Sequence, residues 1–252
     1  MRAVAFLLLG LLSVQAQAVS YVHRFVYVGP GVSEPTPIYA VEPYSDRSGF
    51  GFEDCPLNPD APLPCFFSVK VSDGNYRVTV TLGSHFASET TIKAELRRLM
   101  LDAVQVPAGA SVERSFIVNV RTPRIDADNV VALKAPRETV DEARAWDERL
   151  TLEISGAPAA IRRLVIEPVK VPTLFLLGDS TVADQLGEPY ASWGQMITAL
   201  FKPSIAVANH AESGETFRDS LARKRLDKVL AALQPGDTVL MQFGHNDQKQ
   251  TR

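Results

Sequence analysis

The chain has 252 residues, which allows one or two domains, and its hydrophobic fraction of 46% can supply a sizeable core. Its 26 Lys and Arg residues are balanced by 29 Asp and Glu residues, which leaves a formal net charge of -3 at pH 7. This balance gives no reason to expect nucleic acid or an anionic membrane surface as a partner.

The N-terminus is typical of a secretory signal peptide. Met1 and Arg2 form a short positive start, residues 3–12 are apolar, and residues 16–18 fit the small-residue pattern of a cleavage site. We therefore expect residues 1–18 to be removed, and a mature chain starting near Val19 to be secreted or periplasmic. The apolar run is too short to span a bilayer, and no later run is long enough.

Cys55 and Cys65 flank a proline-rich stretch that cannot form a regular helix or strand. In an oxidising compartment we expect a disulfide between them, with two unpaired thiols as the alternative. This spacing without a histidine partner is a poor pattern for zinc.

Residues 19–168 are dominated by short stretches in which apolar and polar residues alternate, notably at 76–82, 116–120 and 150–154. This period marks strands with one buried face, and the turn signals between them predict a β-sandwich or jelly roll. Exposed aromatic rings on such a domain could stack on sugars, and the candidates are Tyr39, Tyr44, Phe50 and Trp146. Packing in the core or at an edge is the other interpretation of all four.

The pattern changes after residues 167–172, where Pro168 and Pro172 predict an extended linker. Strands are expected at 173–177, 205–208 and 237–243. Helices are expected at 192–200, with Ser192 as N-cap, and around the apolar stripe of 226–233. The alternation predicts a parallel sheet with helices on both faces, in a second domain at 169–252.

Three loops follow the three predicted strands and carry a hydroxyl, a flexible backbone donor and a side-chain amide: Ser180, Gly214 and Asn246. Parallel strands share a direction, so these loops should meet at one edge of the sheet. A serine nucleophile with donors around a developing oxyanion is what acyl transfer needs. Taken singly, each residue also fits a structural role, as a helix cap, a turn glycine or a loop cap.

These loops read G-D-S-T, N-H-A-E-S-G-E-T-F-R and F-G-H-N-D-Q, and they resemble the first three sequence blocks of the SGNH (GDSL-type) hydrolases, most closely rhamnogalacturonan acetylesterase. The resemblance implies Ser180 as nucleophile and an oxyanion hole from the Ser180 and Gly214 N–H groups and the Asn246 amide, with Asp179 supporting the turn. It implies a flavodoxin-like α/β/α fold, no metal or other cofactor, and an O-acetyl group on pectin as substrate. The front region resembles, more diffusely, a galactose-binding-like jelly roll.

One block of the family is missing. The family's catalytic Asp and His belong to a D-x-x-H block, and no such block follows Asn246 before the chain ends at Arg252. His245 and His210 are poor substitutes as the base. Three strands would leave an open sheet edge and a bare apolar face, so we expect an incomplete hydrolase domain and an inactive, truncated esterase.

The function expected is therefore that of an exported esterase acting on acetylated plant cell-wall polysaccharide. The alternatives are a carbohydrate-binding protein with a vestigial hydrolase part, or another SGNH reaction such as that of a lipase or thioesterase. The basic residues after the Gly214 loop could meet the carboxylates of a uronic-acid polymer, or could form a solvated helix face: Arg218, Arg223, Lys224 and Arg225.

Overall fold

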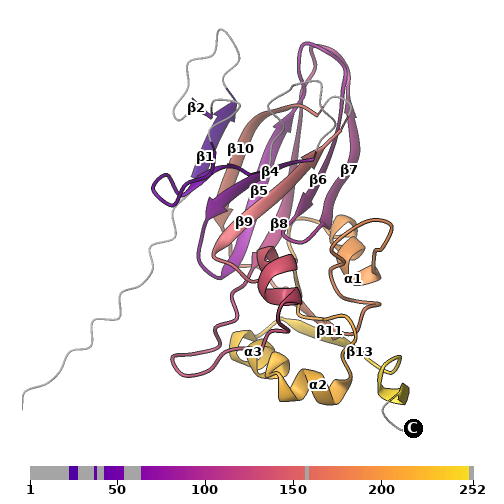
Figure 1. Cartoon of the computed structure of the whole chain (residues 1–252). Coiled ribbons are helices and arrows are strands. Elements are labelled where there is room, and N and C mark those ends of the chain that lie inside the picture. The colour runs from indigo at the N-terminus through magenta and orange to yellow at the C-terminus, as the bar shows by residue number, and fades with distance from the viewer. Residues whose placement is uncertain (1–22, 28–36, 39–42, 54–63, 157–158, 250–252) are drawn as a thin grey trace, which may run out of the picture.

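The structure is a computed structural model of the whole chain, and it describes residues 23–27, 37–38, 43–53, 64–156 and 159–249 (Figure 1). The predicted signal peptide, Tyr39 and Cys55 lie outside these residues. The expectations for cleavage at residue 18 and for the Cys55–Cys65 bridge therefore remain predictions.

Two five-stranded sheets make up the front of the chain. The first has the order β2-β1-β10-β5-β8, from β2 (Pro37–Ile38), β1 (His23–Tyr27), β10 (Ile161–Pro168), β5 (Gly74–Leu82) and β8 (Val112–Val120). The second has the order β3-β4-β9-β6-β7, from β3 (Phe50–Glu53), β4 (Cys65–Lys70), β9 (Arg149–Ser155), β6 (Ser88–Ala94) and β7 (Arg98–Val106). Apart from the parallel pair of β1 and β2, neighbouring strands in these sheets are antiparallel.

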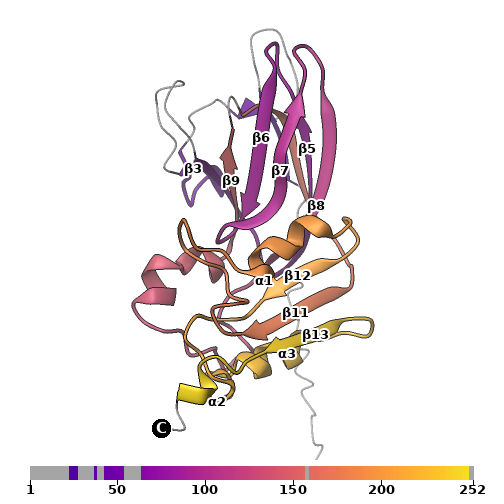
Figure 2. The same cartoon turned by 90° about the vertical axis from the view of Figure 1, so that its right-hand side faces the viewer.

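The two sheets face each other, as Figures 1 and 2 show. One apolar core lies between them. Strand β5 illustrates how the sequence builds it: Val78, Val80 and Leu82 are fully buried, while the alternate residues Thr79 and Thr81 are only partly buried. This is the period-two pattern expected of a strand with one face in a core. The front of the chain is therefore mostly β-sheet, folded as two packed layers.

The connection from β8 to β9 contains two short helices, η1 (Arg137–Asp141) and η2 (Ala143–Ala145). Trp146 follows them and is 6% exposed in a small core with Leu96 and Val131. Its ring is therefore not an exposed platform for a sugar, and the packing interpretation holds for this residue. Phe50 is likewise partly buried against the main core.

The back of the chain forms a parallel sheet in the order β12-β11-β13, from β11 (Thr173–Gly178), β12 (Ala206–Asn209) and β13 (Thr238–Gln242). One face is covered by α1 (Trp193–Met196) and η3 (Ile197–Leu200), whose side chains pack against Leu174 and Leu176. The other face packs against Val229 of α3 (Arg225–Ala232). The chain therefore places helices on both faces of this sheet, as the alternation predicts. Helix α2 (Phe217–Ala222) precedes α3, and η4 (Asp247–Lys249) follows β13.

The apolar stripe predicted for α3 is only partly buried. Val229 is fully buried, whereas Leu230 is 57% exposed and Leu233 is 37% exposed. Strand β13 is one edge of the sheet, and within the described residues no strand pairs with its outer side. Its residues Leu240 and Met241 are 44% and 50% exposed, so this edge is open in the way expected of three strands.

None of the helices formed by the described residues is long and apolar enough to cross a membrane.

Candidate active site

Ser180 lies in the tight turn that ends the buried strand β11. A side chain at Gly178 would meet the Gln242 carbonyl oxygen at 2.6 Å, so this strand end accepts only glycine. Asp179 is 1% exposed, and its Oδ1 accepts hydrogen bonds from the N–H of Thr181 at 3.0 Å and from the Thr181 hydroxyl at 2.9 Å. Asp179 thus braces the turn that presents Ser180.

The Ser180 side chain is half-buried, and no described residue forms a hydrogen bond with its hydroxyl or with its backbone N–H. Its carbonyl oxygen accepts a hydrogen bond of 2.8 Å from Gln185 Nε2. The same Nε2 atom donates to Ser213 Oγ at 3.4 Å, and the N–H of Glu212 donates to the Gly178 carbonyl at 3.1 Å. The turn of Ser180 and the loop of Gly214 are therefore neighbours.

Gly214 is exposed, with φ at +76°, a conformation that glycine adopts without strain. An added Cβ would meet nothing within 4 Å, and the N–H of Gly214 forms no hydrogen bond within the described part of the chain. This backbone donor is therefore free to receive a ligand oxygen.

Asn246 is 8% exposed and joins the third loop to the second. Its Nδ2 donates to the Glu215 carbonyl oxygen at 3.1 Å, and its Oδ1 accepts from Lys249 Nζ at 3.1 Å. The Nδ2 group carries two hydrogens, so one remains for another acceptor. The bond from Phe217 N–H to Asp247 Oδ1, 3.0 Å long, fixes the same pair of loops.

The histidines near these loops do not pair with Ser180. His210 is 2% exposed, and burial together with the cations of Arg121, Lys228 and Arg225 lowers its pKa well below the usual range. It is therefore neutral, with its ring 5.8 Å from that of Trp146. His245 is exposed, and none of the histidine side chains that the structure describes hydrogen-bonds to the Ser180 hydroxyl.

The basic residues that follow Gly214 have different environments. Arg218 is exposed on α2. Arg223 donates to the Ala132 carbonyl at 2.9 Å, and Lys224 donates to Asn129 Oδ1 at 2.7 Å. Arg225 is fully buried, so both expectations, a substrate-binding face and a solvated helix face, are wrong for this residue.

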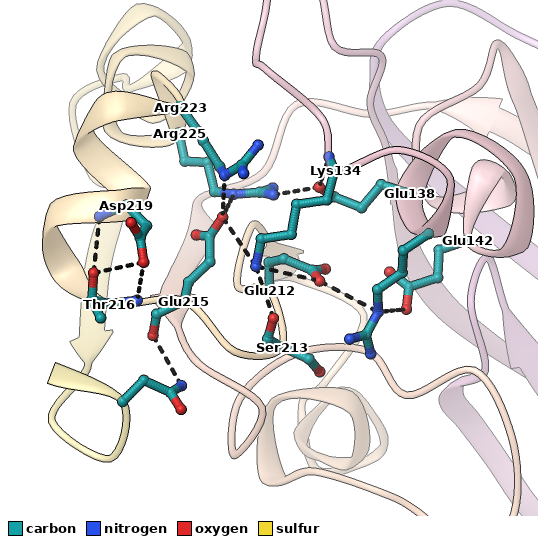
Figure 3. Close-up of polar contacts among 12 residues, drawn as sticks. Lys134, Glu138, Glu142, Glu212, Ser213, Glu215, Thr216, Asp219, Arg223 and Arg225 are labelled. Atoms are coloured by element: carbon teal, nitrogen blue, oxygen red, sulfur yellow. Dashed lines mark hydrogen bonds and ion pairs between the residues drawn. The ribbon is translucent and has the colours of Figure 1, made fainter. Parts of the chain in front are cut away.

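Arg225 belongs to a buried network of charges beside the Gly214 loop, which sequence reasoning missed (Figure 3). Its Nη2 lies 2.6 Å from Glu138 Oε2, and its Nε lies 3.0 Å from Glu215 Oε1. Lys134 Nζ lies 3.6 Å from Glu215 Oε1 and 3.8 Å from Glu212 Oε1. Burial, with the nearby Glu138 carboxylate, raises the pKa of Glu212 to about 8. The only sequence signal for this network is the two acids that flank Ser213 and Gly214 in the loop after a buried strand.

Comparison with known proteins finds similarity over part of the chain, and no protein-family model matches it. Over 85 residues the chain is 41% identical to rhamnogalacturonan acetylesterase RhgT of Bacillus subtilis, covering 33% of this chain and 35% of RhgT. Over 75 residues it is 35% identical to rhamnogalacturonan acetylesterase of Emericella nidulans, covering 30% of this chain and 28% of the relative. The solved structure of protein YXIM_BACsu from Bacillus subtilis aligns with 92% of this chain and 66% of its own, at 23% identity and a TM-score of 0.38.

The chain thus spans only about a third of the length of the curated relatives it matches. The names of both relatives state the same kind of reaction, ester hydrolysis. The similarity of this chain is therefore to enzymes named as acetylesterases, and it covers about a third of the chain.

Proposed function

We propose that this chain carries the nucleophile and the oxyanion hole of an exported serine esterase that removes O-acetyl groups from pectin-type polysaccharide, namely rhamnogalacturonan. The observation that carries the proposal is the set of unengaged groups on three adjoining loops: the Ser180 hydroxyl and the N–H groups of Ser180 and Gly214, none of which bonds to a described residue. The remaining Asn246 amide hydrogen adds a third donor. The names of the partial relatives supply the substrate class.

In this reaction Ser180 Oγ attacks the acetyl carbonyl carbon, and the carbonyl oxygen takes the negative charge. Three donors, from Ser180, Gly214 and Asn246, would receive that oxygen, which is the interaction that lowers the barrier. The sugar oxygen then leaves with a proton, and water releases acetate from the acylated serine. An external base, imidazole in the test below, takes the Ser180 proton and returns it to the leaving sugar oxygen, because no described histidine bonds to this hydroxyl.

The test uses the purified chain and acetylated rhamnogalacturonan, with acetate release measured in the presence and absence of imidazole as an external base. We expect release that depends on Ser180 and rises with imidazole, because the hydroxyl is a weak nucleophile without a base. The Ser180→Ala variant is the control for hydrolysis by imidazole itself. Equal release by the variant and the unmodified chain would refute the proposal.

A further variant probes the oxyanion hole. Asn246→Ala should lower kcat by ~10²–10³ with little change in KM, because the lost donor acts mainly in the transition state. A near-normal kcat would mean that Asn246 has only a structural role, through its hydrogen bond to the Glu215 carbonyl oxygen. Comparison of acetyl, long-chain and thioester substrates distinguishes the acetylesterase from a lipase or thioesterase.

A second candidate is a carbohydrate-binding protein whose hydrolase part is not catalytic. It is favoured by one observation, that no described histidine contacts the Ser180 hydroxyl. In this case the front sheets, which we propose to be a galactose-binding-like jelly roll at residues 19–168, would hold the polysaccharide. Binding of rhamnogalacturonan in calorimetry, without any acetate release that depends on Ser180, would favour this candidate over the esterase.

A further inference from the structure

Lys134, from the segment between β8 and η1, reaches the loop that carries Gly214. Its Nζ donates a hydrogen bond of 2.8 Å to the Ser213 carbonyl oxygen, as Figure 3 shows. The two residues are 79 positions apart in the sequence, so this contact joins the front of the chain to the candidate active site.

The Ser213 carbonyl and the Gly214 N–H belong to the same peptide group. A trans peptide is planar, and its C=O and N–H point in opposite directions. A donor that holds the Ser213 oxygen therefore also sets the direction in which the Gly214 N–H points. This matters because Gly214 has no side chain to restrict its rotation, has open space around its Cα, and sits at a φ of +76°.

Lys134 is itself well held. Its ammonium group lies between the carboxyl groups of Glu212 and Glu215, at 3.8 and 3.6 Å, and its backbone N–H donates to Glu138 Oε2 at 2.8 Å. A cation on a peptide oxygen also polarises the group, which makes the N–H at the other end a stronger donor. The contact therefore sets the direction of the Gly214 N–H and makes this group a stronger hydrogen-bond donor.

We propose that Lys134 is a positioning residue that orients the Ser213–Gly214 peptide, so that the Gly214 N–H can donate a hydrogen bond to the oxyanion. The front of the chain would then contribute directly to the geometry of the active site. This inference rests on the proposed esterase function for its catalytic consequence, but the orientation of the peptide can be measured without any activity.

The first experiment is NMR on the full chain labelled with ¹³C at the serine carbonyl and ¹⁵N at glycine. This labelling selects the amides that follow serine, which belong to Gly49, Gly156 and Gly214. Lys134→Met should shift and broaden the Gly214 signal and leave the other two in place. Lys228→Met is the matched control, because Lys228 also bridges back to front, through a 2.8 Å bond to Asp73, without touching the Gly214 loop.

The second experiment measures ester hydrolysis by the same variants with imidazole present. Lys134→Met should lower kcat between about tenfold and a hundredfold at unchanged KM, below the ~10²–10³ expected for loss of a whole donor. Lys228→Met should leave both constants unchanged.

An unaltered Gly214 signal in Lys134→Met would overturn the proposal, and so would an altered signal with normal kcat. If the Gly214 signal changes but neither the unmodified chain nor either variant hydrolyses esters, the proposed function fails. The role of Lys134 in orienting the peptide then still stands. A fall in kcat in both lysine variants would point to general loosening between front and back, and would also reject a specific role for Lys134.

Discussion

Replacement of Arg225 by methionine should destabilise the fold strongly, because it removes one cation from two buried carboxylates. Arg225, Glu138 and Glu215 are each 1% exposed or less, and the ion pairs are 2.6 and 3.0 Å long. Breaking a buried pair by removing one partner typically costs about 3–5 kcal/mol. Glu215 keeps Lys134 at 3.6 Å and Arg223 at 3.5 Å, so we expect the lower end of this range, about 3 kcal/mol.

The matched control is Arg77→Met. Arg77 lies 3.8 Å from Glu167, and the two side chains are 36% and 40% exposed. Such a solvated pair contributes less than about 1 kcal/mol. Urea denaturation at pH 7, followed by tryptophan fluorescence, gives both changes in the free energy of unfolding. If Arg225→Met costs no more than Arg77→Met, the buried network does not stabilise the protein as we argue.

Three further predictions concern other sites. Burial raises the pKa of Glu95 to about 8, from a usual value of 4.5, so the folded state holds a proton that the unfolded state loses. Stability should therefore fall as pH rises from about 4.5 to 8, and Glu95→Gln should flatten this slope in urea titrations at several pH values. Arg218→Ala should raise KM on the charged polymer but not on a neutral acetyl ester; equal effects would exclude contact with uronic acids. A Cys55–Cys65 bridge, contributing about 2–3 kcal/mol, should leave no cysteine alkylated without reductant, as read by mass spectrometry.

The strands could be predicted from the sequence because their signals are local. Alternation along residues 76–82 reports which side chains face the core, and the structure buries Val78, Val80 and Leu82 accordingly. The gathering of three loops also follows from a local rule, since parallel strands end at the same edge. Hydrogen bonds from Gln185 and Asn246 bear out that the loops adjoin.

The charge network could not be predicted in this way. Arg225 comes after three other basic residues, Arg218 in α2 and Arg223 and Lys224 just beyond it. In the sequence it is as suited to solvent exposure as they are. What buries it is Glu138, which is 87 positions away, and no periodicity encodes a contact of that range. Trp146 shows the same limit, because its indole Nε1 donates to Glu138 Oε1 at 3.0 Å rather than facing a ligand.

The electrostatics make the front of the chain a component of the candidate site. Glu215 is fully buried next to Gly214, and a carboxylate there needs cations. Arg223 and Arg225 supply two from the back of the chain, and Lys134 supplies the third from the front. Without the front, Arg225 would pair only with Glu215 and would lose its ion pair with Glu138. The Ser213 carbonyl would also lose its hydrogen bond from Lys134. Since the peptide plane at Gly214 depends on that donor, the geometry of the proposed oxyanion hole depends on both parts folding against each other.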